Sequence, residues 1–443
     1  MTSVRPVQVG AAPDLKSPLR RDLKPNTEHI EHIEVEHAEH TGHSALSCEN
    51  SDAATLQSLK NIETEAYVAK DVGADFSLVR VILDEVRPDE VLVEMKFCGI
   101  CHTDIVVQRG LLPLVEFPAI LGHEGAGIVR AIGEGVSIRD LAIGDAVLLS
   151  FNSCGSCTTC KSGHPAQCSA SSLININSVR TSDRSTPARL ASDGRPVRSQ
   201  FFGQSAFGRM SVVNGKSVVR CPPEAVDNLG VYAPLGCGLQ TGAGTVLNVI
   251  KPGKGDSIVI FGLGSVGLAA LMAARYLETS QIIAVDIVPE RLAMAKDLGA
   301  SHIINSRISH DVVQEIKDAT GGGPNFAVDC TGVLKVIEDM IACVRPTGTA
   351  VQVGVPPAGG EIKINPQMFL LENKRYIGIL EGDSYPPDFI PTLIAMHQEG
   401  KFPIEKLCRF YAASQLKQAM EDMASGQVLI MLPKVIKPVI RWD

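Results

Sequence analysis

Hydrophobic positions change their spacing along the chain, and the change predicts a β-rich part followed by an α/β part. In the first part, apolar residues alternate with polar residues or form short β-branched runs, a pattern that predicts strands. The predicted strands cover residues 77–83, 90–97, 127–132 and 146–150. Glycine and proline residues separate them, as is typical of a small antiparallel barrel.

From about residue 239, short apolar runs alternate with helical patterns. The runs predict strands at residues 257–261, 282–285, 303–304, 326–329 and 350–353, and two stretches between them predict helices at 266–276 and 289–298. Strands that alternate with helices usually pair in parallel, so this part predicts a doubly wound sheet.

Two segments show no clear periodicity. Residues 1–62 are polar and contain five histidines between His29 and His43. We predict a flexible N-terminal extension, because the segment has no apolar face to pack; an accessory metal-binding tail is the alternative. Residues 169–200 are rich in Ser, Arg and Asn, a composition that predicts a long surface loop.

Composition narrows the class of protein. The length of 443 residues suggests two or three domains at about 150 residues each. The net charge of −8 disfavours a nucleic-acid-binding protein, which usually carries a basic stripe. Two uncharged runs, residues 228–250 and 257–274, are interrupted by glycine or proline and do not predict a membrane span. The N-terminus lacks the apolar segment of a signal peptide, so we expect a soluble cytoplasmic protein.

A glycine-rich turn between a predicted strand and a predicted helix indicates dinucleotide binding. Gly262, Gly264 and Gly267 form a GxGxxG pattern, whose glycines permit a tight turn, close approach of a pyrophosphate and close helix packing. Asp286 ends the next strand 19 residues after Gly267, where a carboxylate binds the adenosine ribose. A helix cap is the alternative role for Asp286. Its charge favours NAD over NADP, although Arg291 could weaken this preference.

Two sets of residues have the chemistry of zinc ligands. Four cysteines lie within 15 residues and predict a closed structural zinc site: Cys154, Cys157, Cys160 and Cys168. A dispersed set, Cys101, His123 and Cys237, would leave a fourth position open, as in a catalytic zinc site. Spacing alone leaves this second assignment open, because the two cysteines could be small buried residues and His123 a hydrogen-bonded core histidine.

The motifs GICHTD, GHEGAG, the four-cysteine lobe, GCGLQTG and GLGSVG occur in the order found in zinc-dependent medium-chain alcohol dehydrogenases. From about residue 65 the chain resembles this superfamily, and the LGCGLQTGAG and FFGQSAF stretches resemble its aryl-alcohol (benzyl alcohol) dehydrogenase branch. The resemblance implies an α/β protein with a GroES-like β-rich catalytic domain and a Rossmann domain. The implied domains are residues 63–238, which hold both zinc sites, residues 239–380, which bind NAD, and residues 381–443, which return to the catalytic domain.

The resemblance also implies roles for individual residues. Cys101, His123 and Cys237 would be the catalytic zinc ligands, with Glu124 close to the metal. Thr103 would take the substrate proton. The implied cofactor-binding residues are His102, Thr241, Gly262, Gly264, Val266, Gly267, Asp286 and Arg291.

The expected activity is reversible oxidation of a primary aryl or allylic alcohol to an aldehyde, with hydride transfer to NAD and one zinc ion in each site. A homo-oligomer, dimer or tetramer, is expected. A double-bond reductase of the same fold is disfavoured because such enzymes typically lack the zinc ligands. A binding module that uses the four-cysteine lobe is disfavoured by the acidic charge and the glycine pattern.

Some positions depart from the family. Val106 stands where many members have a proton-relaying histidine, and residues 428–438 are longer than usual, which leaves open which basic residue there reaches the cofactor phosphates. Ser150 stands where a larger residue often lines the substrate pocket, so its small size would leave room for a ring. Three phenylalanines, Phe201, Phe202 and Phe207, are either an aromatic wall of that pocket or part of the core.

Overall fold

The computed structural model describes residues 60–111, 115–425 and 435–443, all within one compact unit, Leu56–Asp443. The histidine-containing part of the predicted N-terminal extension lies outside the described residues. No helix in these described ranges has the length and apolar character that crossing a membrane requires.

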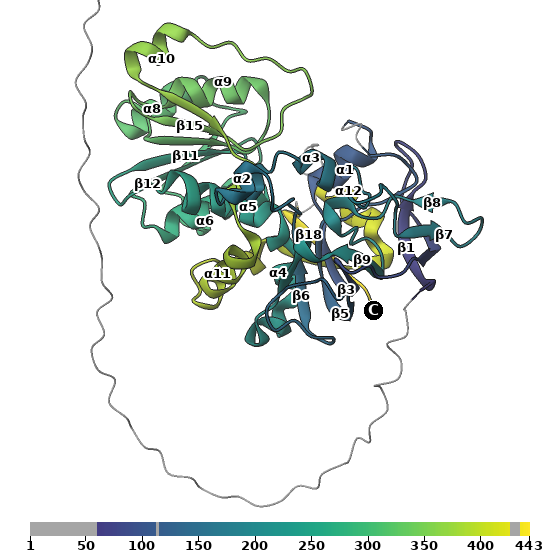
Figure 1. Cartoon of the computed structure of the whole chain (residues 1–443). Coiled ribbons are helices and arrows are strands. Elements are labelled where there is room, and N and C mark those ends of the chain that lie inside the picture. The colour runs from purple at the N-terminus through teal and green to yellow at the C-terminus, as the bar shows by residue number, and fades with distance from the viewer. Residues whose placement is uncertain (1–59, 112–114, 426–434) are drawn as a thin grey trace, which may run out of the picture. The chain divides into compact units, whose positions relative to one another are not determined.

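The β-rich part consists of two sheets (Figure 1). The first sheet has the strand order β4 (Ala119–Ile120), β1 (Ile62–Ala69), β2 (Ser77–Leu83), β7 (Ala188–Leu190) and β8 (Pro196–Val197). The second has the order β10 (Val218–Arg220), β6 (Ala146–Leu149), β5 (Glu124–Ile132), β3 (Glu90–Gly99), β18 (Lys437–Arg441) and β17 (Cys408–Ala412), and β9 (Met210–Asn214) also pairs with β3. The four predicted strands correspond to β2, β3, β5 and β6. Pairing is antiparallel except between β17 and β18, which are parallel.

The prediction of a surface loop at residues 169–200 is wrong. This stretch contains α3 (Ser171–Asn175) and the strands β7 and β8, and Leu190 of β7 pairs with Val81 of β2. Arg180 is only 3% exposed, because Glu90, at the start of β3, neutralises its charge. A polar composition did not reveal this burial, since the acidic partner lies 90 residues away in the sequence.

The predicted doubly wound sheet is confirmed. Six parallel strands have the order β13 (His302–Asn305), β12 (Gln281–Asp286), β11 (Ser257–Phe261), β14 (Phe326–Asp329), β15 (Thr349–Gln352) and β16 (Arg375–Gly378). Helices cover both faces (Figure 1). They are α6 (Ser265–Tyr276) and α7 (Pro289–Asp297) on one face, and α8 (Val312–Thr320) and α9 (Leu334–Cys343) on the other.

The alternation of side chains along β11 explains how the two faces are filled. Ile258 and Ile260 pack in the core that contains α6 and α7, whereas Val259 and Phe261 pack in the core that contains α8 and α9. Successive residues of a strand point to opposite faces, so a continuous apolar run suits a strand that is buried on both sides.

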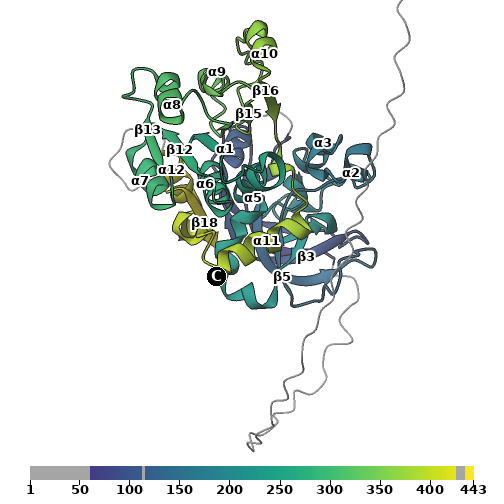
Figure 2. The same cartoon turned by 90° about the vertical axis from the view of Figure 1, so that its left-hand side faces the viewer.

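Several helices join the β-rich part to the parallel sheet. They include α4 (Leu229–Tyr232), α5 (Gly238–Gly244) and α11 (Pro386–Gln398), and α5 packs on α6 (Figure 2). Gly242 permits this packing, because a Cβ atom there would lie 1.9 Å from the carbonyl oxygen of Val266. The remaining helices are α1 (His102–Gln108), α2 (Thr158–Lys161), α10 (Pro366–Glu372) and α12 (Leu416–Ser425).

Candidate active site and metal sites

Three segments that are distant in the sequence bring Cys101, His123 and Cys237 together. Cys101 precedes α1, His123 precedes β5, and Cys237 precedes α5. The metal-binding atoms of these residues and a carboxylate oxygen of Glu124 all lie within 4.8 Å of one another. The structure thus places all three residues of the dispersed ligand set, with Glu124, at one point.

The hydrogen bonds of His123 leave one ring nitrogen for a ligand. Nδ1 lies 3.0 Å from Oδ1 of Asp104, while Nε2 is buried and has no hydrogen-bond partner. Asp104 also accepts hydrogen bonds from the backbone N–H groups of Cys101 and Gly122, each at 3.0 Å. A carboxylate that orients a histidine in this way is typical of metal sites. Two thiols, one imidazole with a free nitrogen and an open side fit Zn²⁺.

The charges around this cluster favour a thiolate. A hydrogen bond with the Cys237 thiol, together with the nearby His123, holds the pKa of the Cys101 thiol well below its ordinary value, although burial opposes this effect. Thiolates are the form of cysteine that binds metals.

Glu124 forms a buried ion pair. It is 0% exposed, and the Nζ atom of Lys437 lies 2.8 Å and 3.0 Å from its two carboxylate oxygens. Burial raises the pKa of the Glu124 carboxyl group, and the opposing charge of Lys437 only partly offsets the rise. Lys437 also donates to the carbonyl oxygen of Ile100, so the last strand of the chain supports the cluster.

Three polar side chains adjoin the cluster. The hydroxyl oxygen of Thr103 lies 3.6 Å from the Cys101 sulfur atom. The hydroxyl oxygen of Thr241 lies 2.9 Å from the carbonyl oxygen of Cys237 and 3.1 Å from Oε2 of Glu381. Burial raises the pKa of the Glu381 carboxyl group to about 7. His102 is exposed at the first residue of α1, and Val106, one turn further on, is half-buried.

A second cluster contains the four cysteines of the predicted structural zinc site. The sulfur atoms of Cys154, Cys157, Cys160 and Cys168 lie within 4.8 Å of one another. Backbone N–H groups point at these sulfur atoms, including those of Cys157 toward Cys154 at 3.3 Å and Cys160 toward Cys157 at 3.5 Å. Hydrogen bonds from the Thr159 hydroxyl group and from the backbone N–H groups of Cys160 and Ser169 lower the pKa of the Cys157 thiol to about 4. Four converging sulfur atoms fit a closed zinc site.

The glycine turn lies at the carboxyl end of β11, which lies between β12 and β14 in the middle of the sheet. Gly262 has a φ of +86°, and a Cβ atom on Gly267 would lie 1.9 Å from the carbonyl oxygen of Gly262. Around Gly264 a Cβ atom would meet nothing within 4 Å, so the N-terminus of α6 is accessible. A helix N-terminus with free N–H groups suits a phosphate.

Asp286 ends β12 beside this turn. Its Oδ2 atom accepts a hydrogen bond from the N–H group of Leu263 at 2.7 Å, and its Oδ1 atom accepts one from Val288 at 2.9 Å. The second bond means that Asp286 also organises the start of α7. Arg291 of α7 approaches Asp286 at 3.9 Å, and its buried Nε atom has no hydrogen-bond partner.

Two of the three phenylalanines contact the imidazole ring of His123. The Phe202 ring stacks on the His123 ring with centroids 4.5 Å apart, and the Phe201 ring meets the same imidazole edge-on at 5.4 Å. Phe202 holds this position with a φ of +52°, a conformation that is strained for a bulky residue. Phe207 packs edge-on to Phe76 at 5.5 Å, and all three phenylalanines are part of one buried core cluster.

Ser150 is fully buried, and its hydroxyl group is engaged in hydrogen bonds. It donates to the carbonyl oxygen of Gly236 at 2.7 Å and accepts from Nε2 of Gln240 at 2.6 Å. The apolar surface next to His123 therefore comes from the two phenylalanine rings rather than from position 150.

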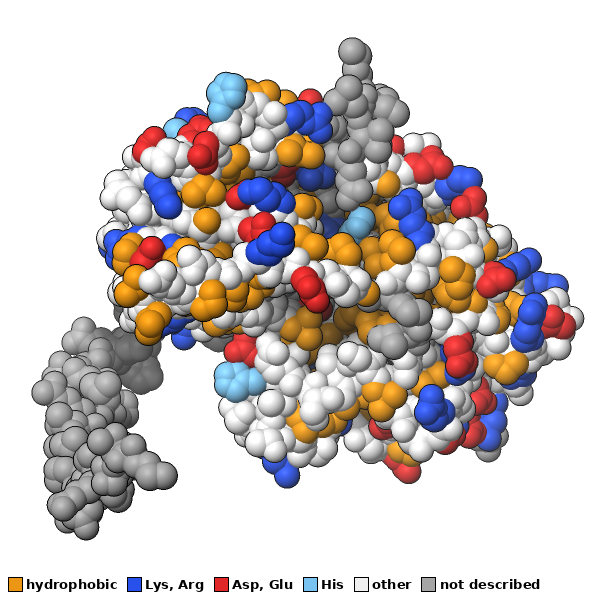
Figure 3. Space-filling view, turned by 90° about the horizontal axis from the view of Figure 1, so that it is seen from above, with side chains coloured by type: hydrophobic (Ala, Val, Ile, Leu, Met, Phe, Trp, Pro, Cys, Tyr) orange, Lys and Arg blue, Asp and Glu red, His pale blue; other side chains and the backbone are white. Residues whose placement is uncertain are grey.

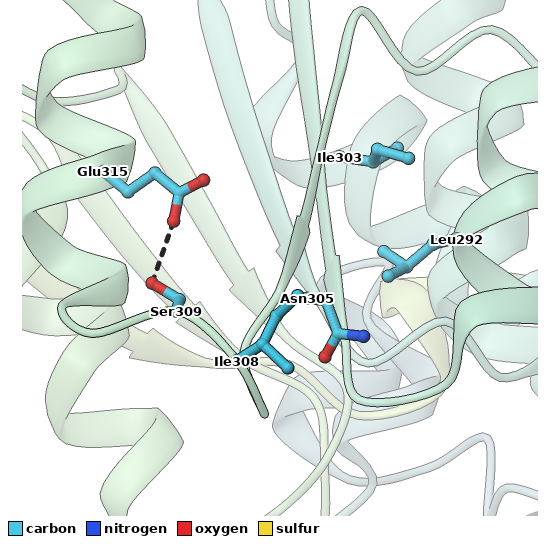
Figure 4. A pocket seen from close by; sticks show the side chains of 6 residues that line it. All are labelled: Leu292, Ile303, Asn305, Ile308, Ser309 and Glu315. Carbon is cyan, nitrogen blue, oxygen red and sulfur yellow. Dashed lines mark hydrogen bonds between the residues drawn. The ribbon is translucent and has the colours of Figure 1, made fainter.

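A pocket of about 370 Å³ lies elsewhere, beside the edge strand β13 (Figure 4). It is lined by Leu292, Ile303, Asn305, Ile308, Ser309 and Glu315. The carboxylate of Glu315 already accepts a hydrogen bond from the Ser309 hydroxyl group at 2.8 Å, and none of the predicted site residues lines this pocket. Because the reactive side chains converge at Cys101, His123 and Cys237 instead, we place the active site there.

Figure 3 shows how charged and hydrophobic side chains are distributed on one face of the molecule. Basic and acidic side chains are interspersed among the described residues on this face, and hydrophobic side chains gather near its centre (Figure 3). No continuous basic stripe is visible among those residues.

Three site residues were missed by the sequence analysis. Asp104 carried a local signal, since it lies three residues after Cys101 and accepts a hydrogen bond from the Cys101 N–H group at the start of α1. Lys437 and Glu381 carried none, because their partners Glu124 and Thr241 lie 313 and 140 residues away.

Comparisons with known proteins agree with this geometry. The family model described as "Alcohol dehydrogenase GroES-like domain" matches residues 87–223, and that described as "Zinc-binding dehydrogenase" matches residues 265–398. The chain is 38% identical to geraniol dehydrogenase of Castellaniella defragrans over 379 residues, which cover 86% of this chain and 98% of that protein.

Solved structures give the same result. The crystal structure of an alcohol dehydrogenase zinc-binding domain protein from Burkholderia ambifaria aligns with a TM-score of 0.81 at 40% identity, covering 87% of this chain and 100% of the other. That of benzyl alcohol dehydrogenase from Acinetobacter calcoaceticus aligns with a TM-score of 0.79 at 37% identity, covering 86% and 100%.

Proposed function

Because the chain belongs to the zinc-dependent medium-chain alcohol dehydrogenase superfamily, we propose that it oxidises primary aryl or allylic alcohols reversibly to aldehydes with NAD. The observation that carries the substrate class is the pair of rings, Phe201 and Phe202, packed on the imidazole of His123. Two relatives are named for geraniol and benzyl alcohol, an allylic and an aryl primary alcohol, which supports this class.

Cys101, His123 and Cys237 are the residues proposed to hold the catalytic zinc ion, and Cys154, Cys157, Cys160 and Cys168 those proposed to hold the structural one. Zinc supplies a Lewis acid that lowers the pKa of an alcohol hydroxyl group. Asp104 orients His123 through its Nδ1 atom, so that Nε2 faces the centre of the cluster. The carboxylate of Glu124 lies beside the cluster, and the ammonium group of Lys437 neutralises its charge.

Thr103 is the proposed proton acceptor. Its Oγ1 atom lies 3.6 Å from the sulfur atom of Cys101, within reach of a hydroxyl group bound at the cluster. Val106, one turn further along α1, has no ionisable group, so the proton leaves Thr103 without passing through a side chain at that position. A positioned proton-transfer group typically accelerates a reaction by about 100-fold or more.

The NAD preference rests on Asp286. A 2′-phosphate would bring negative charge close to this carboxylate, whereas the ribose hydroxyl groups of NAD can donate hydrogen bonds to it. Arg291 lies 3.9 Å from Asp286, and its positive charge reduces the repulsion between this carboxylate and a 2′-phosphate without removing it.

The test of the proposed function is NADH formation with ethanol, hexanol, cyclohexanol and benzyl alcohol at low concentration. Burying a ring in place of a methyl group should strengthen transition-state binding by about 2 kcal/mol, at ~25 cal/mol per Å² of apolar surface. We therefore expect a roughly thirtyfold higher kcat/KM for benzyl alcohol than for ethanol. Phe202→Ala should reduce this ratio while leaving the ethanol rate similar. Equal rates of the wild type with ethanol and benzyl alcohol would reject the aryl substrate class but not the alcohol dehydrogenase activity.

We also propose that two copies associate through β16. This strand ends the parallel sheet, and the adjacent α10 exposes Leu370 by 80% and Leu371 by 74%. Exposed leucines next to an open strand edge are typical of a protein interface. Light scattering after chromatography should give the mass of a dimer or tetramer for the wild type and a smaller mass for Leu370→Asp; a monomeric wild type would refute the interface.

A further inference from the structure

A strained turn follows β16 and enters the active site. Glu381, Gly382 and Asp383 have φ values of +48°, +63° and +45°, so three consecutive residues are left-handed. Glycine adopts this conformation freely, but for a glutamate it costs about 1 kcal/mol or more. Strain of this kind persists only where the surrounding structure enforces it, and it commonly marks a functional position.

Contacts on several sides hold the turn. The side-chain amide of Asn248 donates to the carbonyl oxygen of Gly382 at 3.1 Å, and a Cβ atom on Gly382 would lie 2.6 Å from the carbonyl oxygen of Gln240. Asp383 bonds His164, in the four-cysteine lobe, at 2.8 Å. The backbone is therefore wedged between α5 and that lobe, and its conformation fixes where the Glu381 side chain lies.

The Glu381 carboxylate lies beside the catalytic cluster, and one of its oxygen atoms has only a long contact with a thiol, a weak donor. Oε2 is 3.1 Å from the hydroxyl oxygen of Thr241, whereas Oε1 has the Cys237 sulfur atom as its neighbour, at 4.0 Å. Unlike Glu124, which has Lys437, Glu381 forms no ion pair with a lysine or arginine of the described residues. Glu381 is half-buried, and a partly desolvated carboxylate gains from hydrogen-bond donors, so Oε1 is suited to accept a hydrogen bond from a ligand.

The order of the strands indicates which ligand reaches this point. The glycine turn that suits the pyrophosphate follows β11, and Asp286, which suits the adenosine ribose, ends β12 on one side of it. Ligands of doubly wound sheets bind across the carboxyl ends of the strands. The other half of a dinucleotide would therefore extend toward β14, β15 and β16, where Glu381 and the catalytic cluster lie.

The nicotinamide ring has one group with hydrogen-bond donors, the amino group of its carboxamide. We propose that the carboxylate of Glu381 accepts a hydrogen bond from this amino group and thereby fixes the orientation of the ring next to Thr241. This assignment rests on the proposed function, since it requires a nicotinamide dinucleotide to bind. Glu381 would then be a cofactor-binding residue supplied by the turn after β16.

The test compares the binding of two dinucleotides to the zinc-loaded protein by calorimetry. In 3-acetylpyridine adenine dinucleotide a methyl group replaces the amino group of the carboxamide, so the proposed hydrogen bond cannot form. The variants are Glu381→Gly, which removes the carboxylate and relieves the left-handed strain, and Glu381→Gln, which keeps an acceptor oxygen. Asp383→Asn is the matched control, because it alters the same turn, tolerates the left-handed conformation and leaves Glu381 in place.

We expect the wild type to bind NAD at least tenfold more tightly than the analogue, since a hydrogen bond to a charged group contributes about 1.5–3 kcal/mol. Glu381→Gly should weaken NAD binding by about tenfold or more, leave binding of the analogue similar, and retain both zinc ions and the melting temperature. Glu381→Gln should lose less NAD affinity than Glu381→Gly, because its neutral amide oxygen can still accept a hydrogen bond, although a weaker one. Asp383→Asn should keep the wild-type discrimination.

Three results with Glu381→Gly would overturn the assignment. They are an equal loss of affinity for NAD and for the analogue, an unchanged affinity for NAD, and a loss of zinc. The first would mean that Glu381 only maintains the shape of the site, and the third that it supports the metal. A wild type that bound neither dinucleotide would refute the proposed function itself. A wild type that bound NAD without discriminating against the analogue would refute only the role of Glu381.

Discussion

Replacing Arg180 with alanine should loosen the segment that carries the two aromatic rings of the active site. Arg180 donates to both carboxylate oxygens of Glu90 at 2.7 Å and 2.8 Å, to Asp84 at 3.1 Å and to the carbonyl oxygen of Glu85 at 2.9 Å. Gln200 donates to the same Glu90 carboxylate at 2.8 Å and directly precedes Phe201. Glu90 therefore connects Arg180 to the wall beside His123.

The free-energy cost of Arg180→Ala depends on the hydrogen bonds that remain to the buried carboxylate of Glu90. Glu90 is 1% exposed, and without Arg180 it keeps two donors, the side chain of Gln200 and the N–H group of Arg87 at 3.0 Å. Removing one partner of a buried ion pair costs about 3–5 kcal/mol, and the remaining donors favour the lower end, about 3 kcal/mol. Because 1.4 kcal/mol changes an equilibrium constant tenfold, the fraction of molecules in which this segment is locally unfolded should rise about 100-fold.

Hydrogen exchange measured by mass spectrometry should show this rise in peptides from residues 178–200, while peptides of the parallel sheet stay unchanged. Arg195→Ala is the control in the same segment, because Arg195 forms an exposed pair with Asp193 at 3.6 Å that contributes little. The preference for benzyl alcohol should fall in Arg180→Ala and persist in Arg195→Ala. Unchanged exchange in Arg180→Ala would refute the view that this buried pair holds the segment in place.

Four further substitutions test the sites. Cys160→Ser should reduce the zinc content by one ion per chain and lower the melting temperature, because structural zinc contributes folding energy; full zinc content by elemental analysis would contradict the assignment. Lys437→Met should destabilise the protein by about 3 kcal/mol in urea titrations, because Glu124 would stay buried without its cation, and an unchanged midpoint would refute this. Thr103→Val should lower kcat about 100-fold or more in stopped-flow assays of NADH formation, and wild-type turnover would exclude it as the proton acceptor. Asp286→Gly should narrow the preference for NAD over NADP in kcat/KM, and a wild type that turns over faster with NADP would refute the role given to Asp286.

The sequence predicted those features whose determinants are local. The parallel sheet followed from short apolar runs separated by helical patterns, and the four-cysteine lobe from ligands that are all within 15 residues. Asp286 and the glycine turn were placed correctly relative to each other because a strand, a turn and a helix fix their distance.

The features that the sequence did not reveal depend on distant partners. Residues 169–200 have a polar composition, but Arg180 is buried because it pairs with Glu90. Similarly, Lys437 and Glu381 contact Glu124 and Thr241 only in the folded chain. Family resemblance suggested a phosphate-binding basic residue near the C-terminus. Among the described residues of that segment, Lys437 contacts the carboxylate of Glu124 beside the proposed catalytic cluster.

The positions of the two metal sites along the chain set the order in which they can form during synthesis. The four cysteines of the structural site leave the ribosome almost together, so that site can bind zinc while most of the chain is still unmade. The proposed catalytic cluster needs Cys237, and the cation that neutralises Glu124, Lys437, lies six residues before the last residue of this sequence, in the strand that pairs with β3. If the proposed metal sites are correct, a nascent or truncated chain would carry a metal-loaded lobe but an incomplete catalytic centre, and the proposed alcohol oxidation would require that β18 has joined the sheet.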